Sequence, residues 1–240
     1  MKYLDWTAPT PEENLACDEA LLNLCDNKRI PEVLRFWEPS KHFIVLGYAC
    51  KANQEVYLEK CSALKIPVLR RPSGGGTVLQ GPGCLNYSLL LEINRDSRLR
   101  NLSLTNEYVL SKNAAALQSL LDQPIEIKGT SDLVIGNLKF SGNAQRRGRE
   151  WILFHGTFLL SLDLSLLEEI LPPPPKQPDY RDKRPHRSFL TQLSLSSEKI
   201  KEAMRLVWQA DDKLEGPPKE EIEELVAARY SRPEWNFKFK

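Results

Sequence analysis

The chain has 240 residues, of which 41% are hydrophobic and 27% charged, a composition typical of one ordinary globular domain. Lys plus Arg number 33 against 32 Asp plus Glu, so a net charge of +1 gives no overall field that would attract nucleic acid or an anionic membrane. Because the five cysteines form no C-x-x-C pair, and no segment resembles a signal peptide or a membrane span, we expect a cytoplasmic protein with reduced thiols.

The first predicted element is a helix that begins at Pro11. In "TPEENLACDEALL", Thr10 is the expected N-cap, and Glu13 reaches back to complete a capping box before an apolar stripe. The following segments alternate between strand-like and helix-like patterns of apolar residues. Strands are predicted at 33–37, 43–47 and 66–70, and a helix opened by Asn53 is predicted at 53–64.

The second half continues this alternation. A long amphipathic helix is predicted at 104–121, and the turn pair Gly136-Asn137 indicates a hairpin within "DLVIGNLKFSGNA". A strand at 151–160 and a short helix from Asp163 follow, and the tract at 176–189 after "PPPP" reads as a polar loop rather than packed structure. Closing helices are predicted at 196–210 and 217–230, so helices mixed with hairpins favour an α+β fold or a mixed α/β sheet.

The stretch "RRPSGGGTVLQG" places Arg70 and Arg71 directly before three glycines. Consecutive glycines suit positive φ angles or close approach of a ligand to the backbone. Their bare amides, together with guanidinium groups, favour a phosphate or carboxylate ligand. The spacing matches neither a P-loop nor a dinucleotide-binding loop, and a sharp turn between two strands remains the alternative.

A second group of polar residues lies in the later strands. Lys139 interrupts an apolar hairpin strand, Asp132 stands in the strand before it and His155 in the strand after it. Near a bound anion Lys139 would act as a point charge, although such a lysine also suits a sheet edge that faces water. Asp132 could equally cap a turn, and His155 could be an ordinary core histidine.

These segments together resemble the lipoate-protein ligase and octanoyltransferase family, whose catalytic domain is related to biotin-protein ligase. The resemblance covers most of the chain, from "NLACDEALL" through "RRPSGGGTVLQGPG" and "DLVIGNLKFSGNA" to "HGTFLLSLDLSLL". It implies an α+β fold with a mixed, largely antiparallel sheet flanked by helices. Residues 1–240 would form a single catalytic domain without a separate C-terminal accessory domain.

The resemblance also implies an activity. Such a ligase would activate lipoate or octanoate with ATP and Mg²⁺ and pass the acyl group to a lysine of a lipoyl carrier domain, of the 2-oxoacid dehydrogenase E2 or glycine cleavage H protein type. Lys139 would be catalytic and would contact the acyl carbonyl and a phosphoryl oxygen, and Asp132 would lie near the metal or the adenylate. The residues that the resemblance assigns to nucleotide and acyl binding are Arg70, Arg71, Ser73, Gly74, Gly75, Gly76, Thr77, Val78, Leu79, Asp132, Lys139 and His155.

Two departures from the family pattern keep alternatives open. Gln80-Gly81 stands where family ligases often have His-Asp, and no cysteine follows Cys84, although octanoyltransferases of this superfamily use a cysteine thioester. Thr130 and Ser131 are poor substitutes, because a hydroxyl without a strong base is scarcely ionised. The alternatives are an ATP-independent transferase that uses Cys84, a binding module without chemistry, and a ligase that needs a partner chain.

Overall fold

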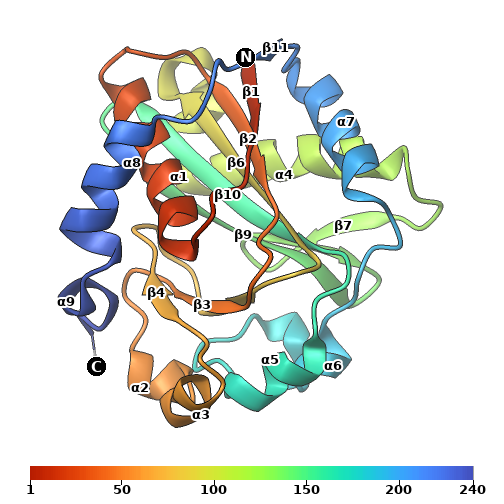
Figure 1. Ribbon diagram of the computed structural model, residues 1–240. Helices are drawn as coiled ribbons and strands as arrows, with labels where there is room; N and C mark the ends of the chain where they lie inside the picture. Colours follow the sequence, from red (N-terminus) through yellow and green to blue (C-terminus); the bar gives the residue numbers. More distant parts are fainter. Residues whose placement is uncertain (240) are drawn as a thin grey trace.

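The computed structural model describes residues 1–239 and has an α+β architecture around a mixed sheet (Figure 1). Within those residues the large sheet has eight strands in the order β11-β1-β2-β6-β10-β9-β8-β7, and a small sheet has the order β4-β3-β5. The pairs of β1 with β2 and with β11 are parallel, and the remaining pairs of the large sheet are antiparallel. The strands are β1 Lys2–Asp5, β2 Val33–Trp37, β3 Phe43–Leu46, β4 Val68–Arg70, β5 Val78–Gln80, β6 Cys84–Glu92, β7 Ile125–Lys128, β8 Asp132–Ile135, β9 Leu138–Arg147, β10 Trp151–Leu159, and β11 Asp212–Lys213.

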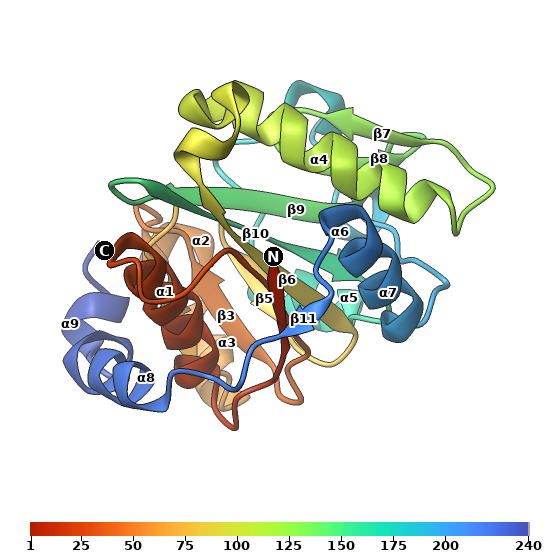
Figure 2. The ribbon, with the colours of Figure 1, turned by 90° about the horizontal axis from the view of Figure 1, so that it is seen from above.

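Helices cover both faces of the large sheet (Figure 2). On one face lie α4 and α7, and on the other lie α1 and α8. The α-helices are α1 Pro11–Asp26, α2 Ala52–Glu55, α3 Leu58–Ala63, α4 Leu102–Gln118, α5 Leu164–Ile170, α6 His186–Phe189, α7 Ser197–Trp208, α8 Lys219–Leu225 and α9 Pro233–Asn236. Short 3₁₀ turns lie at Ile93–Arg95, Ser97–Arg100 and Asp179–Arg181, and α8 runs into a π-helical turn at Val226–Tyr230.

Strand alternation decides which face of the sheet carries polar groups. In β6, Leu85, Tyr87 and Leu89 belong to the core under α4 and α7. Because side chains alternate along a strand, Asn86 and Ser88 point to the opposite face. The same period in β10 sends Phe154 to that core and His155 to the other side. The sheet face turned toward α1 and the small sheet therefore receives polar groups from two adjacent strands.

The structure agrees with most predicted elements. The Thr10–Glu13 capping box is present, and the hairpin turns at Gly136, whose φ is +59°. The expected fold class is confirmed, since a mostly antiparallel mixed sheet is flanked by helices. Within residues 1–239 no helix combines the length and apolar character that a bilayer crossing needs.

Two local predictions are wrong. The helix expected at 53–64 is two helices, α2 and α3, separated at Val56, whose side chain is buried in an extended conformation. The tract at 176–189 is also not merely a polar loop, because Arg181 and Phe189 within it are buried and it contains the short helix α6. Packing on the rest of the molecule orders this tract, and its composition gives no sign of that.

Candidate active site

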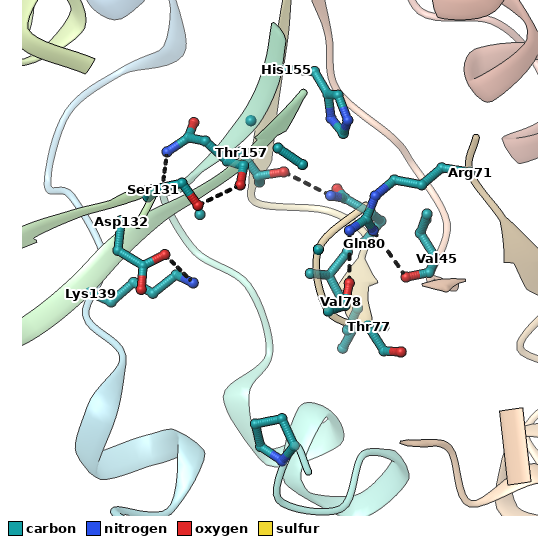
Figure 3. A pocket seen from close by; sticks show the side chains of 18 of the residues that line it. Val45, Arg71, Thr77, Val78, Gln80, Ser131, Asp132, Lys139, His155 and Thr157 are labelled. Carbon is teal, nitrogen blue, oxygen red and sulfur yellow. Dashed lines mark hydrogen bonds and ion pairs between the residues drawn. The ribbon is translucent and has the colours of Figure 1, made fainter. Parts of the chain in front are cut away.

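A cavity of about 510 Å³ opens on the sheet face turned toward α1 and the small sheet (Figure 3). Its wall is formed by the glycine-rich loop, by strands β8 to β10, by the segment 171–190 and by apolar side chains of α1, β2 and β3. Most of the residues that the sequence assigned to a site line it: Arg71, Ser73, Gly75, Gly76, Thr77, Val78, Leu79, Asp132, Lys139 and His155. Arg70 and Gly74 are not part of the lining.

Arg71 holds the glycine-rich loop in shape. Its Nε and Nη2 donate to the carbonyl of Gly74, at 3.1 and 2.7 Å, and Nη2 also donates to the carbonyl of Gly76 at 2.8 Å. Its Nη1 donates to the Val45 carbonyl at 3.4 Å. Burial lowers the pKa of Arg71 to about 10, so the group stays charged at neutral pH. Within residues 1–239 its partners are backbone carbonyls, so its positive charge is still available to an anion.

Two glycines allow the loop to pass close to its neighbours. Gly75 has a φ of +86°, a conformation that residues with a Cβ rarely adopt. A Cβ on Gly47, at the end of β3, would lie 1.9 Å from the carbonyl oxygen of Gly75. By contrast a Cβ on Gly74 would meet no atom within 4 Å. The three consecutive glycines are therefore not equivalent, and Gly75 is the one whose backbone conformation requires a glycine.

The assignment of Arg70 to the ligand is corrected by its position. Arg70 is fully buried behind the loop, and its guanidinium donates to the carbonyls of Gly47 and Cys50 at 2.9 and 2.8 Å. Its Nε donates to the carbonyls of Trp235 and Asn236 at 3.2 Å each. Because consecutive strand residues point to opposite sides, only one of the two arginines can face the cavity. Arg70 instead joins β4 to the C-terminal segment.

Lys139 and Asp132 form an ion pair on the opposite side of the cavity from Arg71 (Figure 3). The Nζ atom lies 2.7 Å from Oδ1 of Asp132, and the lysine side chain is only 25% exposed. The hydroxyl of Tyr180 donates to the other oxygen, Oδ2, at 2.7 Å. Lys139 thus faces the cavity and not bulk water, with its charge close to where a ligand anion would lie.

The fit of a metal ion at Asp132 is poor. Both carboxylate oxygens are already engaged, one by Lys139 and one by Tyr180. Among residues 1–239 no cluster of three or more His, Cys, Asp or Glu side chains is placed to hold a metal ion. The arrangement therefore supports Asp132 as the residue that orients Lys139, and within residues 1–239 no further metal-ligating side chains are grouped with it to complete a Mg²⁺ site.

Two glycines make room for the polar groups beside Lys139. A Cβ on Gly142 would lie 2.7 Å from Nζ of Lys139, and a Cβ on Gly156 would lie 1.8 Å from Oδ1 of Asn143. Asn143 lines the cavity, accepts from the Tyr87 hydroxyl at 2.6 Å, and is fixed by a buried chain of hydrogen bonds that continues into α4 and α7. Asn143 was not among the site residues predicted from the sequence. Its place between Gly142 and Ala144 in the quoted motif was the available signal.

His155 is a neutral hydrogen-bonding group of this wall. Its Nε2 lies 2.6 Å from the hydroxyl oxygen of Ser73 in the glycine-rich loop. Burial and, secondly, the positive charge of Arg71 lower the pKa of His155 to about 3. The imidazole is therefore uncharged at neutral pH and ties β10 to the loop.

This pKa predicts that acid weakens the fold through His155. The unfolded imidazole takes up a proton near its ordinary pKa of 6.5, whereas the folded one resists protonation down to about 3. Stability is thus lost as the pH falls through that window, by at most about 1.4 kcal/mol per pH unit from this one group. Denaturant unfolding of the wild type and of His155→Gln, above and below pH 6.5, should show the wild type losing more stability in acid. Parallel pH profiles for the two proteins would contradict the assignment.

The Gln80-Gly81 pair has a structural explanation. The amide of Gln80 donates to the hydroxyl of Thr157 at 2.8 Å and accepts from Asn86 at 2.9 Å, while Thr157 donates to Asn86 at 2.5 Å. These three side chains form a closed polar ring in the cavity wall. A Cβ on Gly81 would lie 2.2 Å from the ring of His42, so an aspartate cannot stand there without displacing His42.

Among residues 1–239 the cavity lining includes no cysteine. Each of the five thiols is buried, and Cys84 is 1% exposed. Burial raises the pKa of Cys84 to about 12, so its reactive thiolate form is negligible at neutral pH. The prediction that Cys84 is the nucleophile of a transferase has no support in its position. Within residues 1–239 the cavity wall therefore offers no thiol.

The apolar part of the cavity can take an aliphatic chain. One group of its side chains comes from α1 and the strands, and another surrounds α5; they are Leu15, Trp37, Val45, Leu79, Leu153, Leu159, Leu162, Leu167 and Leu171. Cavities that bind small molecules commonly combine such an apolar lining with a few convergent polar groups. The chemistry of this wall suits a ligand with both an aliphatic part and an anionic part.

Comparison with known protein families agrees with this geometry. A model of the lipoyl protein ligase A/B catalytic domain matches residues 10–206, which include every cavity group described so far. The chain belongs to this family. It is an enzyme of the lipoate-ligase and octanoyltransferase family, and the resemblance inferred from its motifs is confirmed.

The named proteins that this chain resembles include both octanoyltransferases and lipoate-protein ligases. The octanoyltransferase LipM of Brevibacillus brevis is 27% identical over 274 residues, covering 99% of this chain and 98% of the relative. A bi-partite lipoate protein ligase of Thermoplasma acidophilum, solved in a study that includes its E2 lipoyl domain, shares the fold with a TM-score of 0.83 and 21% identity, over 100% of this chain and 96% of that one. A lipoate-protein ligase A bound with ATP has a TM-score of 0.79 and 22% identity, over 100% and 99%.

Proposed function

We propose that this chain is an ATP-dependent lipoate-protein ligase. In this proposal it activates lipoate or octanoate as the acyl-adenylate and transfers the acyl group to a lysine of a lipoyl carrier domain. The observation that carries the proposal is the cavity wall itself, which combines the charges of Arg71 and Lys139 and the bare amides of the glycine-rich loop with no thiol. Among the similar structures, a ligase bound with ATP shares this fold.

Adenylation needs positioning and charge neutralisation, but it needs no protein nucleophile. The carboxylate of the acid attacks the α-phosphate of ATP, and pyrophosphate leaves. The amides of the loop and the ammonium group of Lys139 would stabilise the negative charge that develops on the phosphoryl oxygens. Asp132 would hold that ammonium group in place, and Tyr180 would hold Asp132.

Transfer then requires the ε-amine of a carrier lysine to attack the acyl carbon, with AMP as the leaving group. The amine must first lose a proton, because only its neutral form is a nucleophile. We assign no base to this step. We also assign no metal ion to Asp132, because within residues 1–239 no further metal-ligating side chains are grouped with it.

A cysteine-dependent transferase is the main alternative, since the relative from Brevibacillus brevis is named an octanoyltransferase. A thioester route needs an ionisable thiol at the cavity, whereas Cys84 and Cys50 are both buried and raised in pKa by that burial. A carrier domain is the acyl acceptor in either case. We propose that residues 1–240 act as one catalytic domain. The alternative is a ligase that needs a partner chain, and it is supported by the similar ligase from Thermoplasma acidophilum, which is described as bi-partite.

The decisive assay incubates the chain with ATP, Mg²⁺ and either lipoate or octanoate, with and without a lipoyl domain. We expect pyrophosphate release that depends on the acid, and a lipoyl domain whose mass increases by one acyl group. Acylation from an octanoyl carrier without nucleotide would instead favour the transferase. Ligand binding without any acylated carrier would favour a binding module, and activity that appears only with an added accessory chain would overturn the single-domain proposal.

The thiols provide a separate prediction. The variant Cys84→Ala should retain wild-type acid-dependent pyrophosphate release and carrier acylation, because its sulfur does not lie on the cavity wall. The side chain is buried, so a modest loss of thermal stability is expected. A folded variant that no longer acylates the carrier would point back to a thioester mechanism.

A further inference from the structure

A path of hydrogen bonds crosses the large sheet and ends on the cavity wall. The indole Nε1 of Trp208 in α7 donates to Oδ1 of Asn113 in α4 at 2.8 Å, and Nδ2 of Asn113 donates to the hydroxyl of Tyr87 in β6 at 2.8 Å. That hydroxyl donates to Oδ1 of Asn143 in β9 at 2.6 Å, and Nδ2 of Asn143 donates to the carbonyl of Ser131 at 2.8 Å. The path therefore joins two helices on the far face of the sheet to two residues that line the cavity.

The side chain of Trp208 sets the direction of every bond in this path. An indole nitrogen donates but cannot accept, so Oδ1 of Asn113 must face it and Nδ2 of Asn113 must face Tyr87. The Tyr87 hydroxyl accepts from that amide, so its own proton is left for Oδ1 of Asn143. Asn143 must then turn its nitrogen toward Ser131. Because Trp208, Asn113 and Tyr87 are each 2% exposed or less, water does not compete for these bonds.

The end of the path lies beside the ion pair of Asp132 and Lys139. The hydroxyl of Ser131 also donates to the carbonyl of Asn143 at 2.8 Å, so these two residues exchange two hydrogen bonds, which we call the bracket. Ser131 precedes Asp132 in the chain, and Asn143 follows Gly142, the residue paired with Asp132 across β8 and β9. Oδ1 of Asp132 lies 2.7 Å from Nζ of Lys139. The bracket is therefore one residue away from the carboxylate that holds the ammonium group.

The pairing of β8 with β9 gives this carboxylate only short support. Their regular register begins at Asp132 and already shifts between Leu133 and Val134. An irregularity of this kind interrupts the ladder of backbone hydrogen bonds and changes the local twist. The bracket lies directly before this short regular stretch, so it holds the start of β8 where the ladder does not.

We propose that Tyr87 is a positioning residue for the reaction of this cavity, whose hydroxyl holds the bracket and, through it, the ion pair of Asp132 and Lys139. This inference rests on the proposed function, in which the ammonium group of Lys139 stabilises charge on the phosphoryl oxygens. Tyr87 is not part of the cavity lining, so it acts through Asn143 rather than by touching a ligand. Small displacements of a catalytic group lower rates strongly, and a hydroxyl behind the wall thereby affects turnover.

Tyr87→Phe removes the hydroxyl and keeps the ring, which stacks on Phe158 at a centroid distance of 5.0 Å. The amide of Asn143 then loses the donor that fixes it at 2.6 Å. We expect kcat for acid-dependent pyrophosphate release to fall on the order of three- to tenfold, while KM for ATP changes by less than about twofold. A wild-type kcat in folded Tyr87→Phe would overturn the proposal.

Tyr230→Phe is the matched control. Tyr230 is 0% exposed, as is Tyr87, and its hydroxyl donates to the buried carboxylate of Glu19 at 2.6 Å. Neither Tyr230 nor Glu19 is part of the cavity lining. Thermal unfolding should show that both variants lose stability, whereas the control should keep the wild-type kcat. An equal fall of kcat in the control would assign the effect to a general loosening of the fold and would contradict the role of Tyr87.

The background Lys139→Met tests whether Tyr87 acts through the ion pair. Residues that act through one group have non-additive effects. Adding Tyr87→Phe to Lys139→Met should therefore lower pyrophosphate release by no more than about twofold beyond the effect of Lys139→Met alone. A further loss as large as that of Tyr87→Phe in the wild-type background would show that the hydroxyl acts independently of Lys139, and the proposal would be wrong.

Chemical labelling tests the same role without turnover. Acetylation by a water-soluble N-hydroxysuccinimide ester, followed by mass spectrometry, measures how readily an amine leaves its ion pair. Lys139 should be labelled on the order of two- to tenfold faster in Tyr87→Phe than in the wild type. Lys128, which is paired with Glu126, should be labelled at the same rate in both proteins.

The labelling separates this inference from the proposed function. Unchanged labelling of Lys139 in Tyr87→Phe would overturn the role of Tyr87 and leave the ligase function standing. Faster labelling of Lys128 by the same factor would indicate a loosened sheet and would also overturn it. A wild type without acid-dependent pyrophosphate release would overturn the ligase function, and the labelling of Lys139 would still decide whether Tyr87 holds the ion pair.

Discussion

Replacing Lys139 with methionine is expected to lower acid-dependent pyrophosphate release by about 10²- to 10³-fold, the usual effect of removing one preorganised donor from a developing oxyanion. Methionine keeps the length of the side chain and removes its charge. Asp132 retains the hydrogen bond from Tyr180, so the wall should keep its shape. Pyrophosphate release with lipoate or octanoate is the measurement, with carrier acylation measured by mass in parallel.

Lys128→Met is a well-matched control for this variant. The side chain of Lys128 is 25% exposed, as is that of Lys139, and it also forms an ion pair on a strand of the same antiparallel region, with Glu126 at 3.6 Å. It does not line the cavity. The control should retain wild-type turnover and comparable stability. Normal turnover in folded Lys139→Met would show that the ion pair with Asp132 is structural and that the ammonium group takes no part in the reaction.

Much of the fold follows from local signals. The capping box of Thr10 and Glu13 and the Gly136 turn depend on a few adjacent residues, and the structure has both. The break between α2 and α3 could not be predicted in the same way. It arises because Val56 is buried in an extended conformation between the two helices. Tertiary packing imposes this conformation, whereas the residues on either side of Val56 in the sequence are compatible with a continuous helix.

The sequence motifs predicted most of the residues that line the cavity, but they did not predict which side-chain contacts those residues make. Alternation along β4 indicates that Arg70 and Arg71 point to opposite sides, yet it does not say which one faces the cavity. That choice depends on the C-terminal segment, whose Trp235 and Asn236 carbonyls accept from Arg70. Asn143 was missed for a similar reason, since its place on the wall depends on hydrogen bonds with Tyr87 and Ser131.

Gly75→Ala is expected to damage the glycine-rich loop. A φ of +86° costs a residue with a Cβ about 1–2 kcal/mol, and the new Cβ would lie 2.8 Å from Nη2 of Arg71. Because that nitrogen donates to the carbonyls on both sides of Gly75, the loop and the guanidinium cannot both keep their positions. ATP binding, measured by calorimetry, should weaken by about tenfold or more as the anion-binding amides are displaced.

Gly74→Ala distinguishes this conformational demand from a general need for glycine. Its Cβ would meet no atom within 4 Å, and its carbonyl would still accept from Arg71. The variant should therefore stay within about 0.5 kcal/mol of the wild type in stability and bind ATP normally. Equal losses in both variants would mean that the loop must flex rather than hold one shape. Loss in Gly75→Ala alone would mean that a single left-handed residue, held by Arg71, sets the positions of the amides that face the ligand.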